Sequence, residues 1–389
     1  MHEAEKCPVE AGEYLRRLKG KGGATSLKGL ESSDGVDLSA SRRRSSCEIL
    51  KETLHRTVVE DTSTELGSDE VRSFVHEADR TMKKLADEGH EATLNNLEIS
   101  VLEAVIETDG SRPSLLVQNN RVETDDLRLG DWNGSVSDFT AEIERAARAT
   151  ARVVIAGDLS PNSVAGTAWM IAPGLAVTAK HVVEGAFVRH GDDWVNRFNA
   201  PVTLNFDVEA NAPATPGIKV SAVRWYSPDT IGFRLDLANL DMAVLELETE
   251  GPAPLSLAAN LEFPPGEPMI HVIGHPKQPL AFGNTTSDVF EQIRARVFGD
   301  TFGVKRWSPG ILQIGPGSLP EDINNHVMTH DASTLGGNSG SPVLDLVSFG
   351  DRAVGLHYGG YFEDKNYAHP IGELQKHVDS ITPPVPSFV

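Results

Sequence analysis

The sequence predicts a mainly β protein, an antiparallel barrel or sandwich, with a small helical region in front of it. The first observation is a series of short β-rich runs, separated by Gly, Pro, Asn and Asp, that fills residues 150–360. The second is the helical spacing of apolar residues between positions 48 and 107. The third is chain length, because 389 residues are enough for two or three folding units.

The N-terminal third divides into two parts. Residues 1–47 are rich in Gly, Ser, Lys and Arg, which predicts a flexible leader with a short helix at residues 14–18. Residues 48–135 are predicted to be mostly helical, with a β segment at residues 114–118 and a polar connector at residues 119–137. Three groups of apolar residues define the helical faces: Ile49, Leu50 and Leu54; Val71, Phe74, Val75, Met82 and Leu85; and Leu94, Leu97, Val101, Leu102 and Val105.

Residues 150–382 are predicted to form the β domain. A helix at residues 141–149 leads into a first strand at residues 152–156. Short β-rich runs then follow one another with turn residues between them, and two barrels would fill this length. The C-terminal residues 371–381 predict a helix that ends before Pro383.

Charge argues against a nucleic-acid-binding protein. The chain carries 56 acidic and 35 basic residues, for a formal net charge of −21. Binding to phosphates needs clustered Lys and Arg side chains, and the main basic cluster is Arg42-Arg43-Arg44 in a Ser-rich stretch. We interpret that cluster as a solvated linker.

Cysteine usage and hydropathy predict a cytoplasmic location. Cys7 and Cys47 both lie in the N-terminal part, so the β domain has no cysteine for a disulfide, which fits a reducing compartment. The N-terminus lacks the apolar run of a signal peptide. No window approaches the about 20 apolar residues of a membrane span. We therefore expect a cytoplasmic protein with no membrane span.

The most informative motif is Gly-Gly-Asn-Ser-Gly-Ser-Pro-Val at residues 336–343. It places Ser339 in a glycine-lined turn whose backbone N–H groups can point at an oxyanion. A serine hydroxyl becomes a useful nucleophile when a base removes its proton and fixed donors hold the developing negative charge. We predict that Ser339 is a nucleophile and that the N–H groups of Gly337 and Ser339 form the oxyanion hole.

A candidate base and a candidate acid precede the Ser339 motif in the sequence. Residues 166–185 predict two short apolar strands around a Pro173-Gly174 turn, followed by a tight turn that carries His181. An imidazole can accept and return a proton near neutral pH, which makes His181 the candidate general base. Asp241 opens a strand-like apolar run and can orient that imidazole, and Asp236 is the alternative acid.

Two further histidines suggest a metal pair. His271 and His275 are four residues apart, but they lie in a strand that runs into a turn, so they would not share a helical face. No nearby carboxylate completes a His-Glu-x-x-His site. We therefore expect a structural role for both histidines, and neither a metal nor another cofactor.

The chain resembles the trypsin-like serine peptidases of the chymotrypsin fold, in particular the bacterial branch close to glutamyl endopeptidases. The resemblance covers residues 150–380. It is carried by Gly166-Thr167, residues 177–182, residues 241–245, residues 336–342 and residues 354–360, in this order. It implies a chymotrypsin-like double antiparallel β-barrel and a His181, Asp241, Ser339 triad, with Asp241 favoured over Asp236. Residues 298–306 and 330–336 are similar to a bacterial subgroup, which implies a bacterial stress or defence role.

The resemblance also implies a substrate pocket. Thr334, His357 and Gly359 match positions that bind the substrate in this family, and in glutamyl endopeptidases the first two recognise an acidic side chain. Two interpretations stay open: His357 holds a substrate carboxylate, or it is a residue of the pocket wall. Ser333 stands where a trypsin carries Asp, so a preference for Arg or Lys is not expected. Asn338 stands where animal enzymes carry Asp, so activation by a new N-terminal ammonium is not expected.

Two classes of function follow. The first is a serine endopeptidase that hydrolyses protein or peptide substrates, with the helical region at residues 48–135 as a regulatory unit or a docking site for a protein partner. The second is a catalytically silent peptidase fold that serves as an interaction or signalling scaffold. The presence of all three catalytic residue types favours the enzyme.

Overall fold

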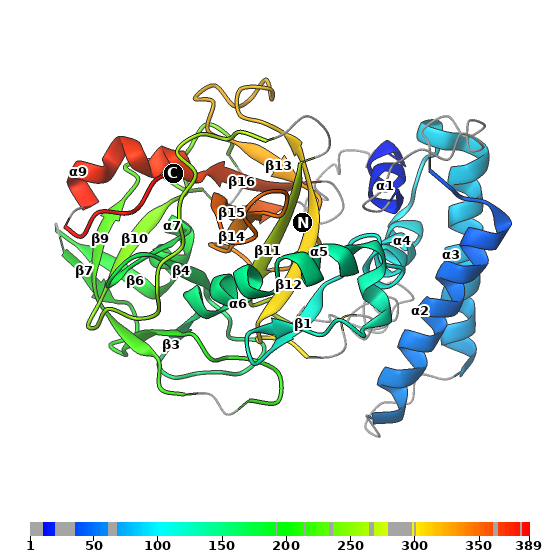
Figure 1. Ribbon diagram of the computed structural model, residues 1–389, viewed down its shortest axis with the longest axis horizontal. Coiled ribbons are helices and arrows are strands. Elements are labelled where there is room, and N and C mark those ends of the chain that lie inside the picture. The colour runs from blue at the N-terminus through cyan, green and yellow to red at the C-terminus, as the bar shows by residue number, and fades with distance from the viewer. Residues whose placement is uncertain are drawn as a thin grey trace, which may run out of the picture.

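The computed structural model contains a helical unit and a β body (Figure 1). It describes residues 11–19, 36–60, 68–191, 193–212, 215–232, 236–263, 268–278, 298, 301–360, 365–381 and 383–389. Cys7 and most of the predicted leader lie outside these residues. Among the described helices, none combines the length and the apolar character needed to cross a bilayer.

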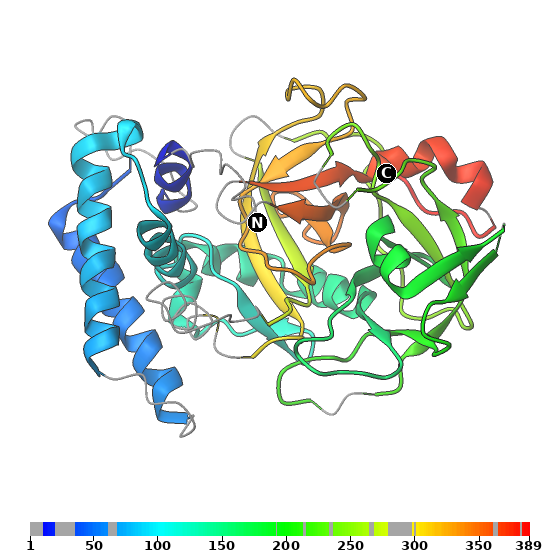
Figure 2. The same ribbon diagram turned by 180° about the vertical axis from the view of Figure 1, so that it is seen from behind.

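The helical unit lies at one end of the molecule (Figures 1 and 2). Its elements are α1 (Ala11–Leu18), α2 (Ala40–Glu60), α3 (Ser68–Glu88), η1 (Gly89–Glu91) and α4 (Asn96–Thr108). The long helices α2 and α3 lie side by side, and α1 and α4 lie between them and the β body. Asn95 caps α4, because its side chain accepts from the N–H groups of Leu97 and Glu98. α2 begins at Ala40, within the segment predicted to be a leader.

The first barrel is closed and antiparallel. Its hydrogen-bonded strand order is β10-β5-β4-β3-β8-β9. The strands are β3 (Thr150–Ile155), β4 (Gly166–Ala172), β5 (Leu175–Thr178), β8 (Val202–Asn205), β9 (Ile218–Tyr226) and β10 (Ala243–Leu247). Every residue of β4 and of β5 is buried, which explains their near-continuous apolar sequences.

The second barrel is built in the same way. Its order is β11-β14-β15-β16-β13-β12, and pairing of β11 with β12 closes it. The strands are β11 (Met269–Gly274), β12 (Arg306–Ile314), β13 (Met328–His330), β14 (Pro342–Asp345), β15 (Ala353–Gly360) and β16 (Asn366–Pro370). The predicted double antiparallel β-barrel with a helical N-terminal region is confirmed.

The segment after α4 belongs to the β body. β1 (Leu115–Gln118) pairs with β12 and with β2 (Arg121–Val122). Val117 and Trp132 are buried in the same hydrophobic core as the two barrels, whereas α1 to α4 enclose a separate core. The range predicted as one helical region, residues 48–135, is therefore shared between two cores.

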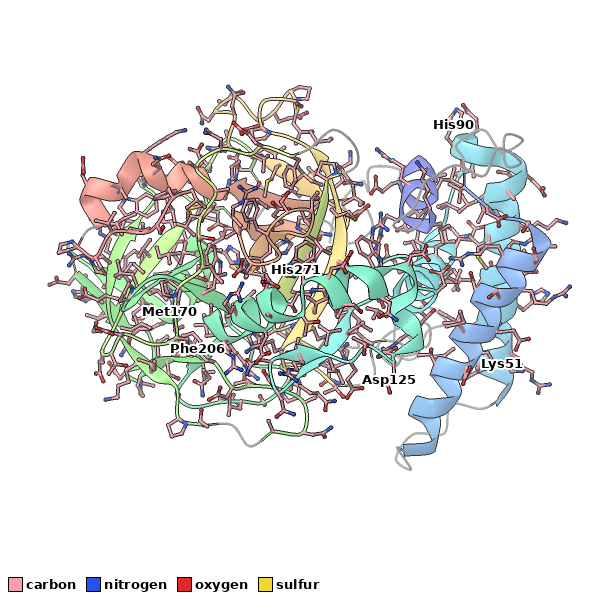
Figure 3. The ribbon with its side chains drawn as sticks, in the orientation of Figure 1. Lys51, His90, Asp125, Met170, Phe206 and His271 are labelled. Atoms are coloured by element: carbon pink, nitrogen blue, oxygen red, sulfur yellow. The ribbon has the colours of Figure 1, made fainter. Side chains whose placement is uncertain are left out.

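Short elements connect and cover the barrels. They are η2 (Leu127–Trp132), α5 (Asn133–Asp138), α6 (Thr140–Ala149), α7 (Lys180–Ala186), β6 (Phe187–His190), β7 (Asp193–Asn196), η3 (Ile371–His377) and α9 (Val378–Ile381). The predicted C-terminal helix is thus a 3₁₀ helix followed by one α-helical turn. Met170 on β4 and His271 on β11 are buried, while Lys51 is exposed on the helical unit (Figure 3).

Candidate active site

His181 stands at the start of α7, directly after β5. Ala179 has extended backbone angles, φ −69° and ψ 142°, and caps the helix, so His181 falls in its first turn. Backbone N–H groups in a first turn have no partner inside the helix, and the N–H of His181 donates instead to Asp241 Oδ1 at 2.9 Å. The imidazole is held at the barrel surface, with its side chain 37% exposed.

Asp241 makes a second contact with the same residue. The ring Nδ1 of His181 donates to Asp241 Oδ2 at 2.6 Å, which leaves Nε2 as the ring nitrogen that can accept a proton. Asp241 is itself fixed, because its backbone N–H donates to His369 Nε2 at 2.9 Å. The alternative acid, Asp236, lies in its own turn and accepts from the N–H of Ala238 and from Asn239 Nδ2.

The two charges stabilise each other. Burial alone would lower the pKa of His181, but the hydrogen bond and the negative charge of Asp241 outweigh it, and the pKa is raised. Burial alone would raise the pKa of Asp241, but the hydrogen bond and charge of His181 outweigh it, and that pKa is lowered. The pair therefore favours an imidazolium beside a carboxylate.

The turn that carries Ser339 requires glycine on both sides. Gly337 has φ +94°, and a Cβ there would lie 2.5 Å from the carbonyl oxygen of His275. Gly340 has φ +89°, and a Cβ there would lie 2.1 Å from the carbonyl oxygen of Thr167. A side chain at either position would meet both backbone strain and a clash with backbone atoms.

The same turn presents two unused donors. The N–H of Asn338 donates to the carbonyl oxygen of Leu335 at 3.1 Å, and the N–H of Gly340 donates to that of His357 at 2.7 Å. Within the described residues, the N–H groups of Gly337 and Ser339 have no hydrogen-bond acceptor. Two unpaired N–H groups beside a half-buried serine are suited to bind a negatively charged oxygen.

The serine turn lies against the histidine turn across β4. The N–H of Thr167 donates to the carbonyl oxygen of Ser339 at 2.8 Å. A Cβ on Gly166 would lie 3.0 Å from that oxygen and 2.5 Å from the side chain of Val182, the neighbour of His181. Over the part of the chain that the structure describes, no hydrogen bond joins the Ser339 hydroxyl to the His181 imidazole.

The predicted pocket residues come from two segments, the stretch before the Ser339 turn and strand β15. Thr334 Oγ1 donates to Asn366 Oδ1 at 2.5 Å. His357, on β15, is 3% exposed, and its Nδ1 lies 3.2 Å from His330 Nε2. Gly359 pairs with Tyr367 in the β15–β16 ladder. Burial, followed by the neighbouring imidazoles of His330 and His181, holds the pKa of His357 well below its usual range, so it is neutral at neutral pH.

The two histidines that suggested a metal pair have separate partners. His271 Nε2 donates to the carbonyl oxygen of Gly350 at 2.6 Å, and His275 Nδ1 lies 3.4 Å from Thr167 Oγ1. Both side chains are fully buried, and burial lowers the pKa of His271 to about 4.

Several neighbours of the site were not found from the sequence. His330 contacts His357, His369 accepts from Asp241, and Asn366 contacts Thr334. Their partners are 27, 128 and 32 residues away in the chain, and strand pairing brings them together. A single sequence carries no local signal for such contacts.

The β body is similar to known serine proteases. The family model of the trypsin-like peptidase domain matches residues 166–356. A probable serine protease of Lysobacter enzymogenes is 29% identical over 285 residues, which cover 69% of this chain and 71% of that protein. The mouse serine protease FAM111A is 27% identical over 195 residues, which cover 47% of this chain and 30% of the mouse protein.

Two solved structures also align with the chain. The active form of the Rv3671c protease from M. tuberculosis has a TM-score of 0.38 at 16% identity, over 65% of this chain and 88% of that chain. Deg5 has a TM-score of 0.38 at 17% identity, over 63% of this chain and 93% of that chain. The fold assignment rests on the strand pairing described above. The matched domain and the two relatives support a trypsin-like serine peptidase.

Proposed function

We propose that the chain is a serine endopeptidase in which Ser339 is the nucleophile, His181 the general base and Asp241 its orienting acid. The observation that carries this proposal is the two-point contact between Asp241 and His181, at 2.9 Å and 2.6 Å, next to a serine turn with two unpaired N–H groups. Each part has a defined task in acyl transfer.

In the first half of the reaction, Ser339 Oγ attacks the carbonyl carbon of the scissile peptide bond. His181 Nε2 takes the hydroxyl proton, and Asp241 stabilises the imidazolium that forms. The carbonyl oxygen becomes negative, and the N–H groups of Gly337 and Ser339 donate to it. The C–N bond then breaks, and His181 gives its proton to the leaving amine.

In the second half, water attacks the acyl group on Ser339 Oγ. His181 Nε2 accepts a proton from this water. The ester bond then breaks, His181 returns the proton to Ser339 Oγ, and the carboxylic acid is released. The missing hydrogen bond between Ser339 and His181 in the free protein is compatible with this scheme, because catalytic hydrogen bonds often tighten only when substrate binds.

The decisive test of the enzyme class is covalent labelling. A fluorophosphonate probe is expected to label Ser339, because attack on its phosphorus uses the same base and the same oxyanion donors. Mass spectrometry of the labelled protein locates the residue, and mapping of cut sites in a proteome digest gives the side-chain preference. A folded protein that is not labelled but still binds a protein partner would support the scaffold alternative.

We further propose an acidic preference in the pocket formed by Thr334, His357 and Gly359. A substrate carboxylate entering this pocket would lie beside a buried, neutral imidazole. Burial of an unpaired carboxylate is costly, so binding favours protonation of His357, and His330 at 3.2 Å shares the resulting charge through their hydrogen bond. The pocket would thus take up a proton together with an acidic substrate.

This proton uptake predicts a pH-dependent preference. The pKa of His357 is lowered in the free protein, so the imidazolium that holds the carboxylate is lost as pH rises. The ratio of kcat/KM for a Glu peptide to that for its Gln counterpart should fall by up to about tenfold per pH unit. The protonation of His181 changes both values of kcat/KM by the same factor, so its effect cancels in this ratio. A ratio that does not change with pH would contradict the acidic preference.

Other functional expectations stay predictions from the sequence. These are the cytoplasmic location, the bacterial stress or defence role, and a protein partner bound through the helical unit. Identification of the cleaved cellular proteins, by comparison of cells that contain the protein or lack it, tests the proposed role.

A further inference from the structure

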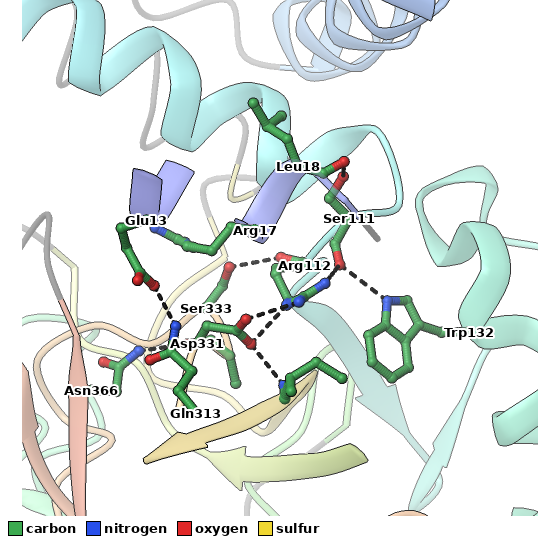
Figure 4. A network of polar contacts seen from close by, with 12 residues as sticks. Glu13, Arg17, Leu18, Ser111, Arg112, Trp132, Gln313, Asp331, Ser333 and Asn366 are labelled. Carbon is green, nitrogen blue, oxygen red and sulfur yellow. Dashed lines mark hydrogen bonds and ion pairs between the residues drawn. The ribbon is translucent and has the colours of Figure 1, made fainter. Parts of the chain in front are cut away.

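A buried arginine connects the N-terminal region with the candidate substrate pocket (Figure 4). Arg112 lies between α4 and β1, and its Nε and Nη2 donate to the two carboxylate oxygens of Asp331 at 2.7 Å and 2.8 Å. The side chains are only 2% and 3% exposed. A paired, two-bond contact of this kind fixes the direction of both groups as well as their distance.

Asp331 opens the segment 331–336, which leads from β13 to the Ser339 turn. A second bond ties this segment to the same arginine, because Ser333 Oγ donates to the carbonyl oxygen of Arg112 at 2.7 Å. Asp331 Oδ1 also accepts from the N–H of Ile311 at 2.7 Å. Arg112 therefore holds the segment through its side chain and through its backbone.

The opposite side of the segment is held by β16. Asn366 Nδ2 donates to the carbonyl oxygen of Ala332 at 2.7 Å, and Asn366 Oδ1 accepts from Thr334 at 2.5 Å. The proposed pocket wall is thus fixed between β16 and the N-terminal region. In a peptidase domain that began at residue 150, the contacts with Ile311 and Asn366 would remain and those with Arg112 would be absent.

The position of Arg112 is itself fixed by contacts with the N-terminal region. Its backbone N–H donates to the carbonyl oxygen of Ile106 in α4 at 2.8 Å. The carbonyl oxygen of Ser111 accepts from Arg112 Nη1 at 2.6 Å and from Trp132 Nε1 at 3.2 Å. Trp132 is buried in the barrel core, so the arginine is fixed to both parts of the molecule.

We propose that Arg112 is a positioning residue that holds segment 331–336 in the conformation that binds substrate. This rests on the proposed peptidase function. The Asp331 carboxylate is buried, and without its counter-charge it would leave the interior or take up a proton. Either change displaces the pocket wall at Thr334. The N-terminal region therefore supports the wall of the substrate pocket.

The ion pair that orders this pocket is formed by two side chains of the same chain. Asn338, directly before the nucleophile, carries no charge that could serve this purpose. Asp331 and Arg112 supply an ion pair eight residues before the nucleophile and 219 residues apart in sequence. This pair needs no cleavage to form.

The test uses full-length Arg112→Ala and separates binding from chemistry. We expect KM for a cleaved peptide to rise by about 10- to 100-fold, because a small misplacement of a binding group has effects of this size. Fluorophosphonate labelling of Ser339 should change only a few-fold, since the small probe does not fill the pocket. Arg112→Lys, which keeps the charge but loses the two-bond contact, should give an intermediate KM.

Arg17→Ala is the matched control. Arg17 forms a similarly buried pair with Glu103 inside the helical unit, where Arg17 Nη2 donates to Glu103 Oε2 at 2.9 Å. Its removal should lower stability without changing KM. An equal rise in KM for both variants would indicate general destabilisation and overturn the proposal.

If Arg112→Ala does not fold, the double variant Arg112→Ala/Asp331→Asn removes the unpaired charge and is measured instead. If the double variant also fails to fold, the KM of Arg112→Lys is compared with that of the wild type instead. A folded variant with the KM of the wild type overturns the inference. A wild-type protein that neither labels nor cleaves any peptide would instead end the proposed function.

Discussion

Replacement of Ser339 by alanine is expected to lower kcat by about 10⁵- to 10⁶-fold, the range found when a serine nucleophile is removed. The reason is that water must then attack the peptide bond directly, without formation of an acyl-enzyme. Stability should change little, because the side chain is half-buried and its hydroxyl makes no hydrogen bond within the described residues. Initial rates on a cleaved peptide, measured at equal folded concentration, give the result.

Ser341→Ala is the matched control, two residues along the same turn. Ser341 is fully buried, and its hydroxyl has no hydrogen-bond partner in the described part of the chain. We expect its replacement to leave kcat/KM within a few-fold of the wild type. If both variants lost activity equally, disruption of the turn would explain the loss, and the nucleophile assignment would be wrong.

Replacement of Asp241 by asparagine is expected to lower kcat by about 10⁴-fold. The side chain keeps its size, but its amide group would donate to His181 Nδ1 instead of accepting from it. The imidazole would then carry its proton on Nε2, where the proton of Ser339 has to be accepted. The rate of hydrolysis and the rate of fluorophosphonate labelling should fall together, because both use the same base.

The pH dependence of the activity of Asp241→Asn is a second, independent test. His181 works as a base only when neutral, so activity falls as pH drops through its pKa. Asp241 raises this pKa, so its loss should move the acid limb to lower pH. Asp236→Asn is the control and should leave both rate and profile unchanged, since the hydrogen bonds that Asp236 makes with described residues lie within its own turn. The opposite pattern would assign the role to Asp236.

Much of the fold was accessible from local patterns. Strands β4 and β5 read as apolar runs around Pro173-Gly174, and α4 reads as apolar residues at helical spacing. The glycines at 337 and 340 stand out because only glycine tolerates their backbone angles. Each of these signals lies within a few residues, where backbone geometry and solvent exposure act directly on residue choice.

Domain limits were less accessible. The sequence predicts a helical region that ends at residue 135, yet β1 pairs with β12 and Trp132 is buried in the barrel core. The pairing partner of a strand is not encoded in the strand itself, since its hydrogen bonds come from the backbone. The start of α2 at Ala40 was hidden in a similar way, because polar residues such as Arg42 and Ser46 pair with Asp109 of a distant segment.

The candidate active site shows the same division between features that local sequence predicts and features that depend on long-range contacts. His181, Asp241 and Ser339 each lie in a local sequence motif. The sequence alone therefore determined the types of these three residues, their order along the chain and the chemistry that we propose for them. Only the tertiary structure decided which carboxylate contacts His181, that His357 is neutral beside His330, and that Arg112 pairs with Asp331. The physical reason is that burial and long-range pairing set charge and position, and these arise only after strands far apart in the chain have closed the barrels.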